Sequence, residues 1–322
     1  MLNFDHIPTY TWPNPAFPFR QYLIHDNLRI FIIENIHHNW KWLKEASRRF
    51  QARDFFLVYC GWECDDWFLS QDLAVFSALD LDKKKFFFLF NTAEEMNRYT
   101  SAGFVGELIN QNCWLPWDLS MRHIPEMTKK YDAVYVGRFT PFKRHWLANN
   151  VNSLALVIGD LMGAEEAQGL PPHTYRNEAP LDEDGVAKII NESKCGLILS
   201  ETEGACFASS EYLLCGIPVV STRSKGGRDI WYNDYNSILV EENPASVAEA
   251  VEYFVKNPRD PNKIRDDHIK KSLEFRETFI RVLKNLFHEN CVELDPLDFF
   301  NTTYMNKLRT SETPVFQQIW PY

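Results

Sequence analysis

The sequence of 322 residues has no apolar segment near the ~20 residues that a membrane-spanning helix requires. Its N-terminus has neither the basic start nor the apolar centre of a secretory signal peptide. It also contains no low-complexity tract and no long block of like charges, which are the usual signs of disorder. These absences predict a soluble, cytoplasmic protein without integral membrane contact.

Basic residues are also outnumbered, with 34 Lys and Arg against 44 Asp and Glu and a formal net charge of −10. Nucleic-acid binding depends on a basic face, so we expect no nucleic-acid partner. No Gly-x-Gly-x-x-Gly follows a predicted strand, which argues against a nicotinamide-dependent dehydrogenase.

Cysteines number only seven, and their odd count and scattered positions predict reduced core thiols rather than a disulfide framework. Cys60 and Cys64 are separated by three residues, but no second pair of ligands stands near them in the sequence. The spacing therefore predicts no zinc site.

The chain does contain a regular alternation of strand-like and helix-like segments. The proline-rich residues 1–25 predict an extended, irregular start. The apolar runs that follow predict strands at 28–34, 54–60 and 85–90, with helices at 39–50 and 93–101 between and after them. Such alternation implies parallel strands joined by crossovers.

A second alternating series predicts another parallel sheet after a boundary near residues 120–132. Each of its runs ends on Gly or Ser, as expected for strands buried on both faces, at 133–137, 154–159, 196–200 and 217–221. Residues 296–322 then show helical spacing. The chain, 45% hydrophobic, can supply the two cores that this α/β organisation needs.

The most informative stretch is residues 199–240. Glu203 and Glu211 flank a loop that turns into a predicted helix, and Gly204-Ala205 allows a tight turn close to a ligand. A Gly-Ile-Pro-Val-Val run and a Lys-Gly-Gly-Arg-Asp loop follow. This pattern resembles the donor-binding signature of the family 4 glycosyltransferases, which are retaining enzymes with the two-domain GT-B fold.

The resemblance implies two Rossmann-like domains whose parallel sheets face a cleft, the N-terminal one abbreviated. Residues 1–128 would form the acceptor domain, rejoined by a tail helix at 300–322, and residues 129–299 the donor domain. The implied reaction is transfer of a hexose from a nucleotide diphosphate sugar to a glycan or glycoprotein acceptor. Among such sugars GDP-mannose is favoured, with GDP-glucose or a UDP-hexose as alternatives.

A pair of cations marks the end of the first strand of the second series. Arg138 follows Gly137, and Lys143 lies in the next loop, at the sheet edge where open parallel sheets bind ligands. A forked guanidinium and a compact ammonium suit a diphosphate. The resemblance assigns catalytic roles to Arg138, Lys143 and Glu203, with the two cations stabilising the leaving diphosphate.

The resemblance also names a set of donor-binding residues. Glu203 would accept from the sugar hydroxyls and Glu211 from the ribose diol, beside the amides that open the helix. The whole set is Gly137, Arg138, Lys143, Gly204, Ala205, Cys206, Phe207 and Glu211. No metal ligand and no cofactor are expected, and Asp80-Leu81-Asp82, an Asp-x-Asp sequence, is interpreted as a charged turn.

The first half matches the family less well. Its first glycine is Gly61, and no histidine lies between His38 and His123, so the family's glycine-rich loop and histidine have no counterpart. His37-His38 is interpreted as an exposed pair. The candidate acceptor-site aromatics, interpreted as loop residues, are Trp62, Trp67, Trp114 and Trp117.

Four further points stay open at this stage: the nucleobase loop, the acidic residue after the two glycines, the function and the oligomeric state. The nucleobase loop is expected at residues 175–183, and Asp229 is the nearest acidic residue after the two glycines. A nucleotide-sugar 2-epimerase and a non-catalytic sugar-nucleotide-binding protein are the alternative functions. A homodimer is the alternative to a single chain.

Overall fold

The computed structural model describes residues 19–159 and 169–303, and the expectations for the first 18 residues and for the tail at 304–322 lie outside these ranges. The chain divides into two compact units. The first unit comprises residues 1–114 and 273–322, and the second comprises residues 115–272. No helix in the described ranges combines the length and the hydropathy that a membrane crossing requires.

A five-stranded sheet forms the centre of the first unit, in the order β1-β2-β3-β4-β5. Its strands are β1 (Phe19–Ile24), β2 (Arg29–Glu34), β3 (Asp54–Tyr59), β4 (Phe86–Phe90) and β5 (Val105–Leu108). Strands β2 to β5 are parallel, and β1 pairs antiparallel with β2. The predicted strands β2, β3 and β4 are confirmed. Residues 19–24 are the exception to the irregular start that the prolines predicted, because pairing with β2 satisfies their backbone groups.

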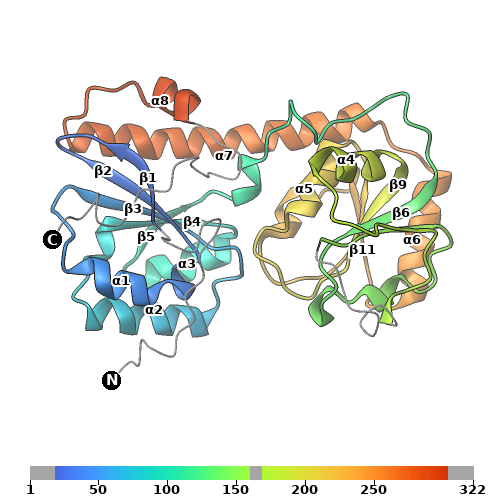
Figure 1. Cartoon of the computed structure of the whole chain (residues 1–322), viewed down its shortest axis with the longest axis horizontal. Coiled ribbons are helices and arrows are strands. Elements are labelled where there is room, and N and C mark those ends of the chain that lie inside the picture. The colour runs from blue at the N-terminus through green and yellow to red at the C-terminus, as the bar shows by residue number, and fades with distance from the viewer. Residues whose placement is uncertain (1–18, 160–168, 304–322) are drawn as a thin grey trace. The chain divides into compact units, whose positions relative to one another are not determined.

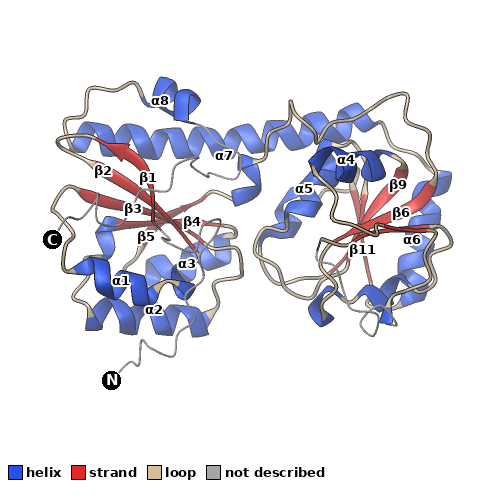
Figure 2. Cartoon of the chain, viewed as in Figure 1, coloured by secondary structure: helices blue, strands red, loops and turns tan. Residues whose placement is uncertain are grey.

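Helices cover both faces of this sheet (Figures 1 and 2). The helices of one face are α1 (Trp40–Ser47), α2 (Asp66–Ala78) and α3 (Ala93–Ser101). The other face is covered by α8 (Pro296–Thr303) and by the part of α7 (Pro261–Glu289) that follows residue 272. A capping box starts α3, where Thr92 accepts from the backbone of Glu95 and the Glu95 carboxylate accepts from the backbone of Thr92.

The core of the first unit between its sheet and α1 to α3 is largely aromatic. Phe56 of β3 stacks on Phe86 of β4 with ring centroids 4.5 Å apart, and Phe88 stacks on Phe90 at 5.6 Å. Tyr99 of α3 closes the cluster against both of the latter rings. These phenylalanines come from runs that are buried on both faces, as the sequence predicted for parallel strands.

The second unit contains a six-stranded parallel sheet in the order β11-β10-β9-β6-β7-β8. Its strands are β6 (Tyr131–Val136), β7 (Leu154–Val157), β8 (Tyr175–Arg176), β9 (Ser193–Ile198), β10 (Val219–Thr222) and β11 (Ser237–Val240). The strand order reverses between β6 and β9. In doubly wound sheets a ligand binds at the carboxyl ends of the strands beside such a reversal.

Two helices cover one face of the second sheet and a third covers the other. The helices are α4 (Glu183–Asn191), α5 (Phe207–Leu214) and α6 (Pro244–Lys256), of which α6 packs on the aliphatic core opposite α4 and α5. Gly196 in β9 allows α5 to approach, because a Cβ there would lie 2.1 Å from the ring of Tyr212. The Tyr212 hydroxyl in turn accepts from the amide of Val136 at 2.7 Å, which ties α5 to the end of β6.

Candidate functional site

Three loops meet at the carboxyl edge of the second sheet, beside its reversal of strand order. They follow β6, β9 and β10. The amide of Glu201 donates to the carbonyl of Phe142 at 2.9 Å, and the amide of Lys225 donates to the carbonyl of Glu201 at 3.1 Å. The amide of Glu203 donates back to the carbonyl of Lys225 at 3.0 Å. Backbone hydrogen bonds therefore hold the three loops in register.

Gly226 is the position where this register depends on glycine. Its φ of +95° lies in the region that L side chains rarely adopt, and a Cβ there would fall 1.5 Å from the carbonyl oxygen of Glu203. The next amide, that of Gly227, donates to the carbonyl of Gly204 at 2.5 Å. The Lys-Gly-Gly stretch thus lets the β10 loop lie directly against the β9 loop.

An ion pair between Lys143 and Glu203 forms the centre of the site. The Lys143 ammonium donates to the Glu203 carboxylate, and the two side chains are only 12% and 9% exposed. The aliphatic part of the Lys143 side chain lies over Gly137, because a Cβ added to this glycine would lie 3.7 Å from the Cε atom of Lys143. Burial alone lowers the pKa of Lys143, but the charge and hydrogen bond of the Glu203 carboxylate outweigh burial and raise that pKa, so the lysine stays charged.

Arg138 is an exposed cation of the site. It is the second residue after β6, and its positive charge lowers the pKa of Lys143, which places the two groups near each other. Among the residues that the structure describes, Arg138 has no hydrogen-bonding or ion-pair partner. The site therefore presents the exposed Arg138 guanidinium beside a buried, mutually neutralised pair.

The β9 loop enters α5 through the expected residues. Gly204 and Ala205 are buried, and Cys206 stands just before the helix in the left-handed region, with φ of 55°. Burial raises the pKa of the Cys206 thiol to about 12, so it remains neutral. Phe207 begins α5, and Glu211 lies half-buried on its second turn.

Two buried arginines beneath the loops were absent from the predicted set. Arg144 donates to the carbonyl of Leu199 and to the Thr222 hydroxyl, each at 2.7 Å. Arg228, fully buried, donates to the Ser200 hydroxyl at 2.8 Å and to the carbonyl of Thr222. They link the ends of β9 and β10. Nothing in the local pattern distinguishes such arginines from surface ones, because Thr222 lies 78 residues from Arg144 and Ser200 lies 28 residues from Arg228.

His145 is a second buried group that the sequence reading missed. Its ring stacks on Tyr135 with centroids 4.3 Å apart, and neither ring nitrogen has a hydrogen-bond partner among the described residues. Burial, and then the charge of Lys143, lower its pKa to about 4. The imidazole is therefore neutral at physiological pH.

Several expectations for the first unit are wrong. Trp114 is fully buried against Phe279 of α7, so it is a core residue and presents no surface to an acceptor. Trp67 is exposed but lies in α2 rather than in a loop. His37 is buried, not exposed, because β2 turns inward through a 3-10 turn that places it beside Cys60 and Cys64. The structure does not describe the side chain of His38.

The remaining expected loops have clear local structures. Asp82 accepts from the amide of Lys84 at 3.0 Å, which confirms the interpretation of Asp80-Leu81-Asp82 as a charged turn. Asn177, in the loop expected near the nucleobase, bonds both backbone groups of Ile158. Asp229 accepts from Arg228 at 3.0 Å.

Comparisons with known proteins agree with this geometry. Residues 180–271 match the family model described as "Glycosyl transferases group 1". This range includes the β9 and β10 loops, Glu203, Glu211 and Gly226. No curated protein sequence matches the chain.

Solved structures share the fold at low sequence identity. Sucrose-phosphate synthase from Thermosynechococcus elongatus superposes with a TM-score of 0.58 and 15% identity, over 81% of this chain and 74% of that one. HepE of Anabaena, in a complex with UDP, superposes with a TM-score of 0.53 and 13% identity, over 79% of this chain and 78% of that one. The UDP-forming trehalose-phosphate synthase from Burkholderia xenovorans superposes with a TM-score of 0.51 and 11% identity, over 80% of this chain and 74% of that one. The chain therefore has the GT-B fold, and its residues 180–271 are similar in sequence to the glycosyl transferases group 1 family.

Proposed function

We propose that this chain is a retaining, metal-independent glycosyltransferase that moves a hexose from a nucleotide diphosphate sugar to a glycan acceptor. GDP-mannose is the favoured donor. The observation that carries the proposal is the Lys143–Glu203 ion pair, which lies beside the exposed Arg138 at the reversal of strand order. Backbone hydrogen bonds between the loops after β6, β9 and β10 hold this pair in place. The group 1 segment and the fold support the same reaction class.

The two cations are placed to receive the charge that develops on the donor. When the bond from the anomeric carbon to the diphosphate breaks, the leaving group gains negative charge, which Arg138 and Lys143 would stabilise. A diphosphate that takes over Lys143 releases Glu203 to accept from hydroxyls of the sugar. Glu211, on the second turn of α5, would accept from the ribose diol.

The proposed transfer proceeds on the face from which the diphosphate departs. The acceptor oxygen bonds to the anomeric carbon there, and the acceptor's proton passes to a phosphate oxygen of the leaving group. Attack from that face preserves the anomeric configuration. Because Arg138 and Lys143 supply the positive charge, the chemistry requires no metal ion at the diphosphate.

Calorimetry without added metal tests the donor site first. GDP-mannose, GDP-glucose, UDP-glucose and UDP-GlcNAc are titrated into the native chain and into Arg138→Ala and Glu211→Ala. We expect one donor to bind and both variants to lose that binding. Arg122→Ala is the matched control, because Arg122 is also an exposed arginine but its carbonyl is bonded by Asn191, which precedes β9 at the opposite edge of the sheet.

Product analysis then tests the reaction. Transfer to a glycan acceptor with retained anomeric configuration, measured by proton NMR, is the expected result. An inverted product contradicts the retaining mechanism. Conversion of the donor in the absence of any acceptor indicates an epimerase, and the lack of binding by all four donors, with or without Mg²⁺, contradicts the proposal as a whole.

A further inference from the structure

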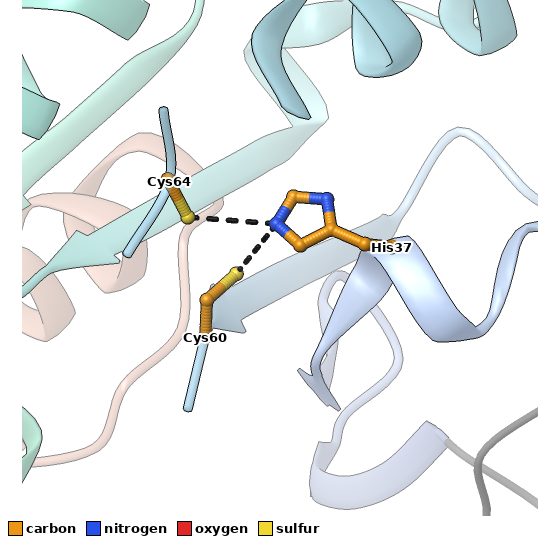
Figure 3. A group of neighbouring side chains, drawn as sticks. All are labelled: His37, Cys60 and Cys64. Atoms are coloured by element: carbon orange, nitrogen blue, oxygen red, sulfur yellow. Dashed lines mark hydrogen bonds between the residues drawn. The ribbon is translucent and has the colours of Figure 1, made fainter. Parts of the chain in front are cut away.

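A cluster of three side chains of the types that bind metals lies in the first unit, apart from the candidate donor site. His37 comes from the 3-10 turn Ile36–His38 after β2, Cys60 directly follows β3, and Cys64 lies just before the residue that caps α2. All three side chains are buried, with exposures of 5%, 4% and 3%. Their ligand atoms lie within 4.8 Å of one another, at the carboxyl ends of parallel strands (Figure 3).

We propose that His37, Cys60 and Cys64 bind one Zn²⁺ ion. The Nε2 atom of His37 lies 3.3 Å from the Cys60 sulfur and 3.5 Å from the Cys64 sulfur. In a tetrahedral site with Zn–N near 2.0–2.1 Å and Zn–S near 2.3 Å, a nitrogen and a sulfur ligand stand about 3.5 Å apart. The two nitrogen-to-sulfur separations are therefore already close to those that a shared zinc ion imposes.

Hydrogen bonding alone accounts poorly for this arrangement. Figure 3 shows both sulfur atoms directed at the same nitrogen of His37. A neutral imidazole nitrogen has one lone pair and accepts one hydrogen, so two thiols compete for a single acceptor. A metal ion between the three atoms uses the nitrogen lone pair and both sulfurs at once.

A buried carboxylate orients the histidine for this role. Asp72 of α2 is fully buried, and it lies 3.3 Å from Nδ1 of His37. It also accepts from the indole of Trp40 at 3.0 Å and the hydroxyl of Tyr99 at 2.9 Å. Because the carboxylate only accepts, Nδ1 carries a ring proton, which leaves Nε2 as the atom through which His37 would bind a metal. Carboxylate–histidine–zinc arrangements use the same hydrogen bond.

The donor set selects the metal by its chemistry. Two thiolates and one imidazole favour zinc over magnesium or calcium, which prefer oxygen ligands. The two thiolates balance the charge of Zn²⁺, so the ion can be buried without a further counter-ion. Binding releases two protons, one from each thiol, and leaves the fourth tetrahedral position to a water molecule. The ion would tie the loop after β3 and the start of α2 to the turn after β2.

Cobalt titration of the metal-free, reduced chain is the direct test, because Co²⁺ in thiolate sites absorbs visible and near-ultraviolet light. We expect a thiolate-to-cobalt band that saturates at one equivalent, is displaced by Zn²⁺, and accompanies the release of two protons. Cys60→Ser and Cys64→Ser should each abolish the band. Cys113→Ser is the matched control, since Cys113 is a buried thiol of the same unit and should leave the band intact.

Asp72→Asn separates positioning from ligation. It should retain the cobalt band but weaken the affinity by roughly 10- to 100-fold, the usual effect of losing an outer-shell partner. If the serine variants do not fold, metal protection of two thiols against alkylation in the native chain provides the same information. A folded, reduced chain without the band, or a band that persists in Cys60→Ser/Cys64→Ser, overturns the proposal. So does a reactive-thiol count two below the chain's seven in the purified, denatured protein, because it indicates a disulfide instead.

Discussion

The two units use the same elements but differ in strand order. In the first unit the parallel strands β2 to β5 follow one another across the sheet, whereas the second sheet reverses between β6 and β9. At a reversal, the loops of neighbouring strands diverge to opposite faces and leave room for a ligand. The second unit places an ion pair and an exposed arginine there, and the first unit fills its carboxyl edge with a buried histidine and two thiols.

The cores differ in a related way. Stacked phenylalanines fill the helix-facing core of the first unit, while the core of the second against α6 consists mainly of aliphatic side chains. The comparison shows that one sheet has an exposed arginine beside a buried ion pair at its carboxyl edge, and the other has a buried histidine and two thiols there.

The largest expected effect is on the hydrogen-bonded loops after β6, β9 and β10 of the second unit. Gly226→Ala forces a methyl group against the carbonyl of Glu203, so the β10 loop must move. Displacement of about 1 Å at such a site reduces function by roughly 100-fold, and we expect donor affinity, measured by calorimetry, to fall by that factor.

Gly103→Ala is the control from the first unit. Gly103 also has a positive φ, +86°, but the nearest atom to an added Cβ is the Lys83 ammonium at 3.8 Å. The strain should lower the free energy of unfolding by about 1 kcal/mol and leave donor binding unchanged. Equal losses of donor affinity in both variants would contradict the role given to Gly226.

The buried ion pairs give the second comparison. Lys143→Ala leaves the Glu203 carboxylate buried without its partner, and we expect the free energy of unfolding in urea to fall by about 3 kcal/mol. Lys143→Ala/Glu203→Ala should recover part of that loss. If the double variant is no more stable than the single one, the pair is not the source of the effect.

Arg29 and Asp54 form the matching pair in the first unit, with N–O distances of 2.6 and 2.8 Å. Arg29→Ala should destabilise the chain to a similar extent, about 3 kcal/mol, while the folded protein retains its donor affinity. Loss of donor binding in folded Arg29→Ala would show that the two units do not act independently.

The buried histidines should differ under acid. His145 has no hydrogen-bond partner among the described residues, whereas His37 contacts Asp72. Because the folded-state pKa of His145 is about 4 and its ordinary value is 6.5, the unfolded chain binds the extra proton first. The stabilisation is full above about pH 6.5 and is lost as pH falls towards 4, by up to about 3 kcal/mol.

Urea unfolding from pH 7 to pH 4, with His145→Phe as the comparison, measures this contribution. The phenylalanine preserves stacking on Tyr135 but cannot titrate, so its stability should fall less steeply with acid. Parallel pH profiles for the two proteins would rule out His145 as the titrating group.

The smallest expected effects come from helix caps, one in each unit. Asp65 accepts from the amide of Phe68 at the start of α2, and Asn243 accepts from the amide of Ser246 at the start of α6. Asp65→Ala and Asn243→Ala should each lower the free energy of unfolding by about 1 kcal/mol. A much larger loss in Asp65→Ala alone, relieved by added Zn²⁺, would indicate that the cap also positions Cys64.

Much of the fold followed from local pattern. Apolar runs predicted the central strands of both sheets, and the range predicted for α3 was correct, because burial on both faces and a capping box leave clear local signals. The short strand β5, Val-Gly-Glu-Leu, and the charged helix α7 have no such run, and the sequence reading did not predict them. Their places depend on contacts made after the central strands have formed.

The candidate site was predicted only in its parts. The spacing of Gly137, Arg138 and Lys143 and of Glu203 and Glu211 was visible because each group lies in one loop or at one helix start. That Lys143 and Glu203 pair, 60 residues apart, depends on β6 and β9 being neighbours. The same holds for His37, which lies 23 residues before the nearer cysteine and was interpreted as exposed.

By itself, therefore, the sequence determined the alternation of elements, the two sheets and the loops that carry charge, because these depend on the periodicity of side chains along a single segment. The tertiary structure alone decided which loops meet. Strand order brings three loops of the second unit together around an ion pair, and the turn after β2 encloses His37 with two thiols. These contacts join residues far apart in the sequence, so the local sequence around one partner does not indicate the other.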